Sequence, residues 1–166
     1  MKAAKIGVGT IVSDASSTGE IATVLLNIIE TVDRRTWLDL LDLWKIPEDV
    51  ASDPMADWWV DDPHALDVVD AALETIEYEA PPLCYVGAHP EDKNRIGVWP
   101  SARYIEESVR SGDTLRVESG TDWGGDMADG YFYVLEVDDD GSMALYVRDW
   151  DLNLTVSWHS NNNEGK

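Results

Sequence analysis

The chain has 166 residues, enough for one compact domain or a domain with a helical appendage, and its 44% hydrophobic content argues against disorder. Its 33 Asp and Glu residues against 12 Lys and Arg residues give a net charge of −21, which disfavours direct binding to nucleic acid or to an anionic membrane. The natural partners of such a surface are basic. The alternative interpretation is a charge that serves only solvation, as in a salt-adapted organism.

The lengths of the apolar segments and the single cysteine both favour the cytoplasm. No apolar run reaches the length of a secretory signal or a membrane span, so we expect a cytoplasmic protein of a bacterial cell without membrane contact. Cys84 is the only cysteine, which excludes an internal disulfide and predicts a reduced, partly buried thiol.

The first half of the chain predicts two helices and a connector. Ser17 and Glu20 form a capping box, and apolar residues then recur at steps of three and four as far as Val32. A second short helix is predicted over residues 36–45. Residues 46–63 are rich in proline and acids and predict an irregular connector.

The most informative helix is predicted over residues 61–79. Asp62 is placed to cap this helix, and Pro63 suits its first position. Its core face is predicted to consist of Leu66, Val69, Leu73 and Ile76. Each of these apolar residues is followed directly by an acidic residue, which gives a second set of Asp67, Asp70, Glu74 and Glu77. Successive carboxylates then stand roughly 4.5–6 Å apart along the axis, comparable in scale with the spacing of charges on a nucleic-acid backbone.

The second half predicts a β-sheet and one short helix. A hairpin is expected from residues 83–87 and 95–100, then a helix from Ser101 to Arg110 and a strand over 114–118. Three strands close the chain, over residues 131–137, 143–148 and 152–158. In the last of them, alternating apolar and polar residues predict one buried and one solvated face.

These elements predict an α+β fold in which N-terminal helices precede an antiparallel β-sheet that ends in a three-stranded meander. The predicted organisation is an N-terminal helical region with its acidic connector over residues 1–60, an α+β domain over 61–160 and a polar tail over 161–166.

Motifs for catalysis and metal binding are incomplete. His89 lies beside Glu91 and Asp92, but no nucleophile elbow accompanies it, and the histidines lack the spacing of a zinc site. The segment from Glu136 to Gly141 imitates the start of a calcium loop, yet the position that needs a bidentate glutamate falls on Val147. We therefore predict that the chain is not an enzyme and uses no cofactor or metal.

Several short segments of the second half resemble a known type of module. They are Tyr85-Val86-Gly87-Ala88-His89-Pro90, Gly97-Val98-Trp99-Pro100-Ser101, Asp140-Gly141-Ser142-Met143-Ala144-Leu145-Tyr146-Val147 and Trp158. Together they resemble a C-terminal module of uncharacterised small acidic accessory proteins of bacterial plasmids and phages, over roughly residues 80–159. The resemblance implies a mobile-element context, in which small and very acidic proteins often block host defence, and it supplies no catalytic residues.

The leading hypothesis is a stoichiometric anti-defence inhibitor whose carboxylates mimic nucleic acid and block the basic channel of a CRISPR effector or, second, a restriction enzyme. The candidate partner-binding residues are Asp57, Trp58, Trp59, Asp61, Asp62, Asp67, Asp70, Glu74, Glu77, Asp122, Asp126 and Asp129. Trp58 and Trp59 are expected to be apolar anchors, although such a pair also commonly pins a loop to the core. The alternative hypothesis is an interaction or immunity-type protein that binds through Trp58, Trp59 and the sheet face, with acidity serving solubility.

Overall fold

The computed structural model describes residues 6–14, 17–123, 125–149 and 151–160. Its contacts divide the chain into two compact units. The helical unit comprises Gly9–Ala80 and Tyr85–Trp99, and the sheet unit comprises Met1–Val8, Pro81–Cys84 and Pro100–Lys166. Residues on both sides of position 60 contribute to the helical unit. The domain boundary expected at that position stays a prediction.

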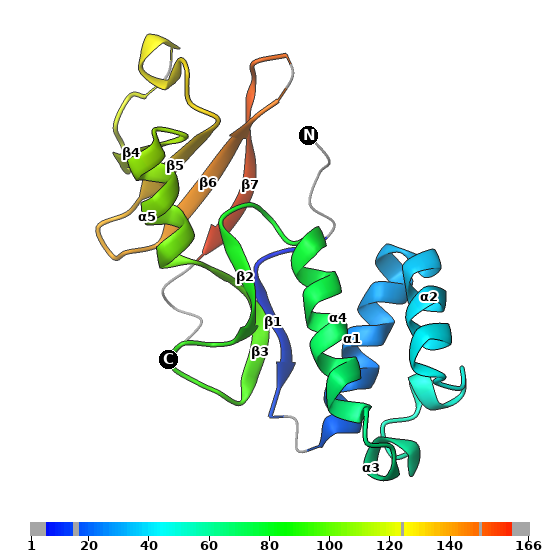
Figure 1. Cartoon of the computed structure of the whole chain (residues 1–166). Helices are drawn as coiled ribbons and strands as arrows, with labels where there is room; N and C mark the ends of the chain where they lie inside the picture. The colour runs from blue at the N-terminus through cyan, green and yellow to red at the C-terminus, as the bar shows by residue number, and fades with distance from the viewer. Residues whose placement is uncertain (1–5, 15–16, 124, 150, 161–166) are drawn as a thin grey trace. The chain divides into compact units, whose positions relative to one another are not determined.

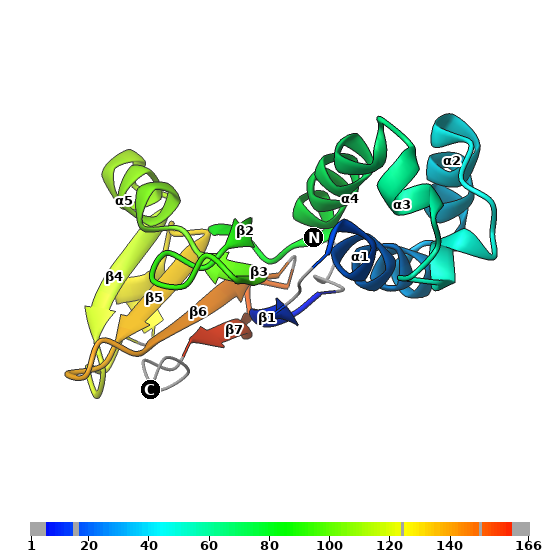
Figure 2. The ribbon, with the colours of Figure 1, turned by 90° about the horizontal axis from the view of Figure 1, so that it is seen from below.

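The helical unit is organised around one helix, α1 (Thr18–Val32), which contacts every other helical segment of this unit. Leu25, Leu26 and Ile29 on α1 are buried and form the centre of this core. Figures 1 and 2 show α2 and α4 beside α1. In chain order the remaining elements are β1 (Gly9–Ser13), α2 (Arg34–Trp44), η1 (Val50–Ser52), α3 (Trp58–Asp61), α4 (Ala65–Glu79), β2 (Cys84–Ala88) and β3 (Arg95–Pro100). The predicted connector therefore contains two short helical segments.

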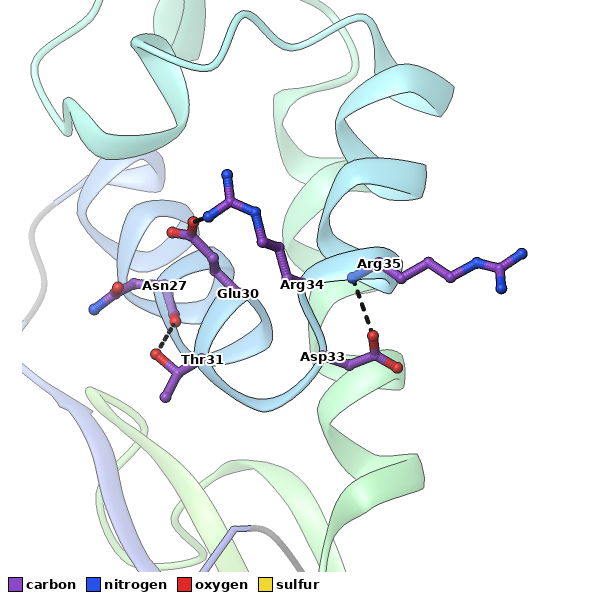
Figure 3. A network of polar contacts seen from close by, with 6 residues as sticks. All are labelled: Asn27, Glu30, Thr31, Asp33, Arg34 and Arg35. Carbon is purple, nitrogen blue, oxygen red and sulfur yellow. Dashed lines mark hydrogen bonds and ion pairs between the residues drawn. The ribbon is translucent and has the colours of Figure 1, made fainter.

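Side-chain caps fix the ends of α1 and α2. The capping box is confirmed, since Ser17 Oγ accepts from the Glu20 amide at 3.2 Å and Glu20 Oε2 accepts from the Ser17 amide at 3.1 Å. Asp33 ends α1 and begins α2, because its Oδ1 accepts from the amides of Arg35 and Thr36. Figure 3 shows this turn, where an ion pair of 2.9 Å joins Arg34 Nη1 to Glu30 Oε1.

A three-stranded sheet completes the helical unit, in the order β1-β3-β2. β1 pairs antiparallel with the central strand β3, with Gly9 opposite Val98. Val98 is fully buried, and the Trp99 indole Nε1 donates to the Gly87 carbonyl at 2.9 Å. The two strands expected as a hairpin are therefore neighbours, and the N-terminal strand adds to their sheet.

The described part of the sheet unit holds the α-helix α5, a short 3-10 helix and a four-stranded sheet in the order β4-β5-β6-β7. Its elements are α5 (Ala102–Ser111), β4 (Thr114–Glu118), η2 (Gly125–Ala128), β5 (Tyr133–Val137), β6 (Met143–Arg148) and β7 (Leu154–Ser160). The meander β5-β6-β7 is antiparallel as predicted. β4, however, runs parallel to β5, so the sheet is mixed rather than antiparallel throughout. A long loop containing η2 makes the parallel pairing possible, because it carries the chain back to the end of the sheet at which β4 starts before β5 begins.

The last strand does not alternate as regularly as its sequence predicts. Opposite β6, Leu145 pairs with Trp158 but Tyr146 pairs with Val156, so the strand carries a one-residue bulge. A bulge reverses the facing of the residues before it. Trp158 is buried and its Nε1 donates to the Pro82 carbonyl, whereas Val156 is 49% exposed and Leu152, ahead of the strand, is 70% exposed.

Candidate protein-interaction surface

The buried side chains of α4 are all small or β-branched. Its buried residues are Ala65, Val68, Val69, Ala72 and Ile76, which follow helical spacing and form a single face. Helix α4 contacts α1 and α3. The buried face is thus rotated from the predicted one: Leu66, assigned to the core, is 67% exposed, and Leu73 is half-buried.

The start of α4 also differs from the prediction. His64 occupies the position before the helix, and its side chain makes no capping hydrogen bond. Asp62 instead follows α3, where its Oδ1 accepts from the His64 amide at 2.8 Å. Asp62 therefore stabilises the turn between α3 and α4 rather than the first turn of α4, and the helix begins two residues after Pro63.

Four carboxylates form a row on the solvent side of α4, which we call the acid row. All four are exposed: Asp67, Asp70, Glu74 and Glu77. At the start of the row, Asp67 Oδ2 lies 3.1 Å from His64 Nδ1. The predicted arrangement of these four side chains on an exposed helix face is therefore present.

The chain around the acid row contains no positive side chain other than histidine. Between Lys45 and Lys93 there is no Lys or Arg. The same stretch holds the following acids: Glu48, Asp49, Asp53, Asp57, Asp61, Asp62, Asp67, Asp70, Glu74, Glu77, Glu79, Glu91 and Asp92. Because like charges three and four residues apart repel, the acid row destabilises its own helix. Glu77 adds to this cost, since the C-terminal end of a helix favours positive charge.

The tryptophan pair divides into one buried and one half-buried side chain. Trp59 is 4% exposed, and its indole Nε1 donates to the Asp53 carbonyl at 2.9 Å. Trp58 is half-buried and contacts the Trp59 ring edge-on, at 4.9 Å between ring centroids. Trp59 therefore holds the 53–57 loop to the core, and only a small part of its side chain stays exposed.

A close approach between α1 and this loop depends on Gly19. A Cβ atom at Gly19 would meet the Pro54 carbonyl oxygen and would stand 2.8 Å from Trp59 Cδ1. Gly19 is buried in the first turn of α1. The absence of a side chain at this position therefore allows Trp59 to reach its place.

Gly19→Ala is expected to lower the free energy of unfolding of the helical unit by about 1–3 kcal/mol, because the added methyl group forces the loop away from α1. Chemical denaturation monitored by circular dichroism measures the change. The opposite sign, a gain of about 0.5–1 kcal/mol, is the ordinary effect of replacing glycine by alanine within a helix, and it would show that the contact is not tight.

Three exposed apolar side chains lie in a groove beside this anchor. Met55 is 80% exposed, Val60 is 85% exposed and Leu66 is 67% exposed. They line a groove of about 560 Å³ together with Asp62 and Trp59. Sequence reasoning missed this groove, because it placed Leu66 inside and treated Met55 and Val60 as parts of a connector. The run of apolar residues among acids was the available signal.

The other candidate acids fall in different places. Asp57 and Asp61 are exposed at α3, close in the chain to the groove. Asp122 and Asp129 are exposed in the loop between β4 and β5 of the sheet unit. The Asp126 side chain lies outside the described part of the structure. Among the candidate acids with described side chains, those from Asp57 to Glu77 thus lie in the same unit as the groove.

The remaining candidates for chemistry are metal-binding clusters, the Cys84 thiol and the calcium-like turn. Among the described residues, no group of three or more His, Cys, Asp and Glu side chains is arranged to hold a metal ion. Burial raises the pKa of the Cys84 thiol to about 12, so this thiol is protonated at neutral pH and is a poor nucleophile. Asp140 accepts from the Ser142 amide at 2.8 Å, which lowers the pKa of its carboxyl group and fits a turn residue.

None of the helices in the described ranges combines the length and apolarity needed to cross a membrane. Comparisons with protein-family models, with curated proteins and with solved structures give no match. The function is therefore argued from the acid row and the groove themselves.

Proposed function

We propose that this chain is a stoichiometric inhibitor that binds the basic nucleic-acid-binding surface of another protein. The observation that carries the proposal is the acid row on the exposed face of α4. This row lies between Lys45 and Lys93, and the residues between these two lysines include no Lys or Arg. The basic channel of a nucleic-acid-binding protein binds phosphates through its Lys and Arg side chains. On α4, carboxylates take the place of these phosphates, so each Lys or Arg of the partner still pairs with a negative group.

The energetics of α4 support this proposal. The acid row weakens the helix through repulsion between neighbours, and the last turn holds no basic residue to offset the helix dipole. A partner rich in Lys and Arg would remove both costs on binding. The net charge of −21 would also speed the encounter, because complementary fields steer association.

A CRISPR effector is the first target to test and a restriction enzyme the second. This choice follows from the mobile-element origin, which stays a prediction.

In the alternative proposal, the chain is an immunity-type protein that binds through Trp58, Trp59 and the sheet face. Trp58 can still serve as an anchor in that case, but Trp59 is a poor anchor because its side chain is buried.

The test uses a double charge reversal in the acid row, Asp70→Lys with Glu74→Lys. Purified CRISPR effectors and restriction enzymes are the panel, and binding is measured with and without competing DNA at about 50 and about 200 mM salt. We expect DNA to compete, affinity to fall steeply with salt, and the double variant to bind at least about tenfold more weakly.

The matched control is Glu106→Lys with Glu118→Lys, two exposed acids of the sheet unit that change the net charge equally. This control is expected to retain most of the affinity, because only long-range attraction is reduced. Equal losses in the two double variants would show that net charge rather than the acid row is recognised. A panel without DNA-competed binding would count against the inhibitor class.

A further inference from the structure

The groove beside α3 is unusual because apolar side chains remain exposed inside the most acidic part of the chain. Met55, Val60 and Leu66 line it, and Pro54 and Pro63 contribute to the same surface. Contiguous exposed apolar surface with a polar rim commonly marks a site of protein interaction. The groove lies wholly within the helical unit.

The rim of the groove is negative. Asp62 is among the lining residues, and Asp57 and Asp61 lie on the short segment that carries Val60. Asp70 lies four residues after Leu66, one turn further along the same face of α4, so the acid row begins beside the Leu66 side of the groove. An occupant of the groove therefore contacts exposed apolar side chains and has carboxylates close by.

Charge complementarity decides the class of occupant. A second copy of this chain would bring another net charge of −21 to a surface that is already negative. A basic segment is attracted instead, and it must also offer an apolar side chain to cover Val60 and Leu66. An amphipathic helix with leucine-like residues on one face and Lys or Arg beside them meets both requirements.

We propose that the groove of Met55, Val60 and Leu66 binds the apolar face of a basic amphipathic helix of the partner, while the acid row pairs with the Lys and Arg residues of that helix. This inference rests on the proposed function and names the part of the partner that is recognised. The acid row supplies attraction, and the groove supplies the preference for one helix over other basic surfaces.

The test uses two synthetic helical peptides of equal charge. One carries leucine on one face and lysine on the other, and in the second every leucine is replaced by glutamine. Binding to the full chain is measured by isothermal titration calorimetry. We expect the leucine peptide to bind at least about tenfold more tightly than the glutamine peptide. Equal affinities, or no binding of either peptide, would overturn the inference.

The groove variant is Val60→Ser with Leu66→Ser, and Met55→Ser is a second variant taken from a loop. Each is expected to bind the two peptides equally weakly, because the apolar contact is lost and the charge remains. The matched control is Leu43→Ser, since Leu43 is 68% exposed, close to the 67% of Leu66, and lies outside the groove. A groove variant that keeps the preference for leucine would overturn the inference.

The charge reversal of Asp70 and Glu74 separates this inference from the proposed function. Both peptides should lose affinity in that variant, while any remaining preference for leucine stays. If the charge reversal has no effect but the groove variant does, the groove binds the apolar face of the helix, whereas both the pairing of the acid row with that helix and the proposed acid-row inhibitor fail. If the charge reversal weakens both peptides and the groove variant changes nothing, the proposed function survives and the groove inference fails.

Discussion

Replacing Trp59 with alanine is expected to lower the free energy of unfolding of the helical unit by about 3–5 kcal/mol. The side chain is 4% exposed and lies against Gly19 of α1, so its removal leaves a cavity between α1 and the 53–57 loop. The Asp53 carbonyl also loses the donor that it has in the indole Nε1. Urea denaturation followed by circular dichroism gives the change, and each unit is fitted separately if two transitions appear.

Two controls make this prediction specific. Trp59→Phe keeps most of the packing and removes the donor, so we expect a smaller loss of about 1–3 kcal/mol. Trp58→Ala removes a half-buried ring and is expected to cost less than Trp59→Ala. If Trp58→Ala proved the more damaging substitution, Trp58 rather than Trp59 would anchor the loop, and Trp59 would again be a candidate for partner contact.

Replacing Arg148 with methionine is expected to lower the free energy of unfolding of the sheet unit by about 2–4 kcal/mol. Its guanidinium donates to three main-chain carbonyls, with Nε at 3.0 Å from Tyr131 O, Nη1 at 3.1 Å from Leu152 O and Nη2 bonded to Ala128 O. These carbonyls belong to the loop before β5 and the turn before β7. Methionine keeps the apolar stem of the side chain and removes every donor.

The measurement is thermal unfolding in the near ultraviolet, where the aromatic residues of the sheet unit contribute. Arg116→Met is the matched control, because Arg116 is exposed on β4 and its replacement should change stability by no more than about 0.5 kcal/mol. Arg148→Lys keeps the charge with fewer donors and should fall between the two. Equal effects at positions 148 and 116 would show that the three carbonyl bonds contribute little.

Local signals in the sequence were sufficient where neighbours in the chain satisfy each other. The capping box of Ser17 and Glu20 needs only residues three apart, and it begins α1 as predicted. Ser101 likewise caps α5 through the Tyr104 amide, and Gly112 ends that helix in the left-handed conformation. The strands of the meander followed from short apolar segments between tight turns.

Which side of a helix or strand is buried was harder to predict, because this depends on what packs there. On α4, Leu66 has a larger side chain than Ala65, Val68 and Ala72, yet those three are buried and Leu66 is exposed. On β7, the bulge opposite Leu145 and Tyr146 changed the facing of Val156. The parallel pairing of β4 with β5 likewise depends on where a long loop returns.

The sequence by itself determined the charge, the α+β class, the caps of α1 and α5 and the exposed acid row, because these depend on composition and on residues within one or two turns of each other. Only the tertiary structure decided that Trp59 is buried, that Leu66 is exposed and that Met55, Val60 and Leu66 line one groove. These outcomes depend on contacts between segments distant in the chain, such as Gly19 with Trp59, for which local periodicity carries no information.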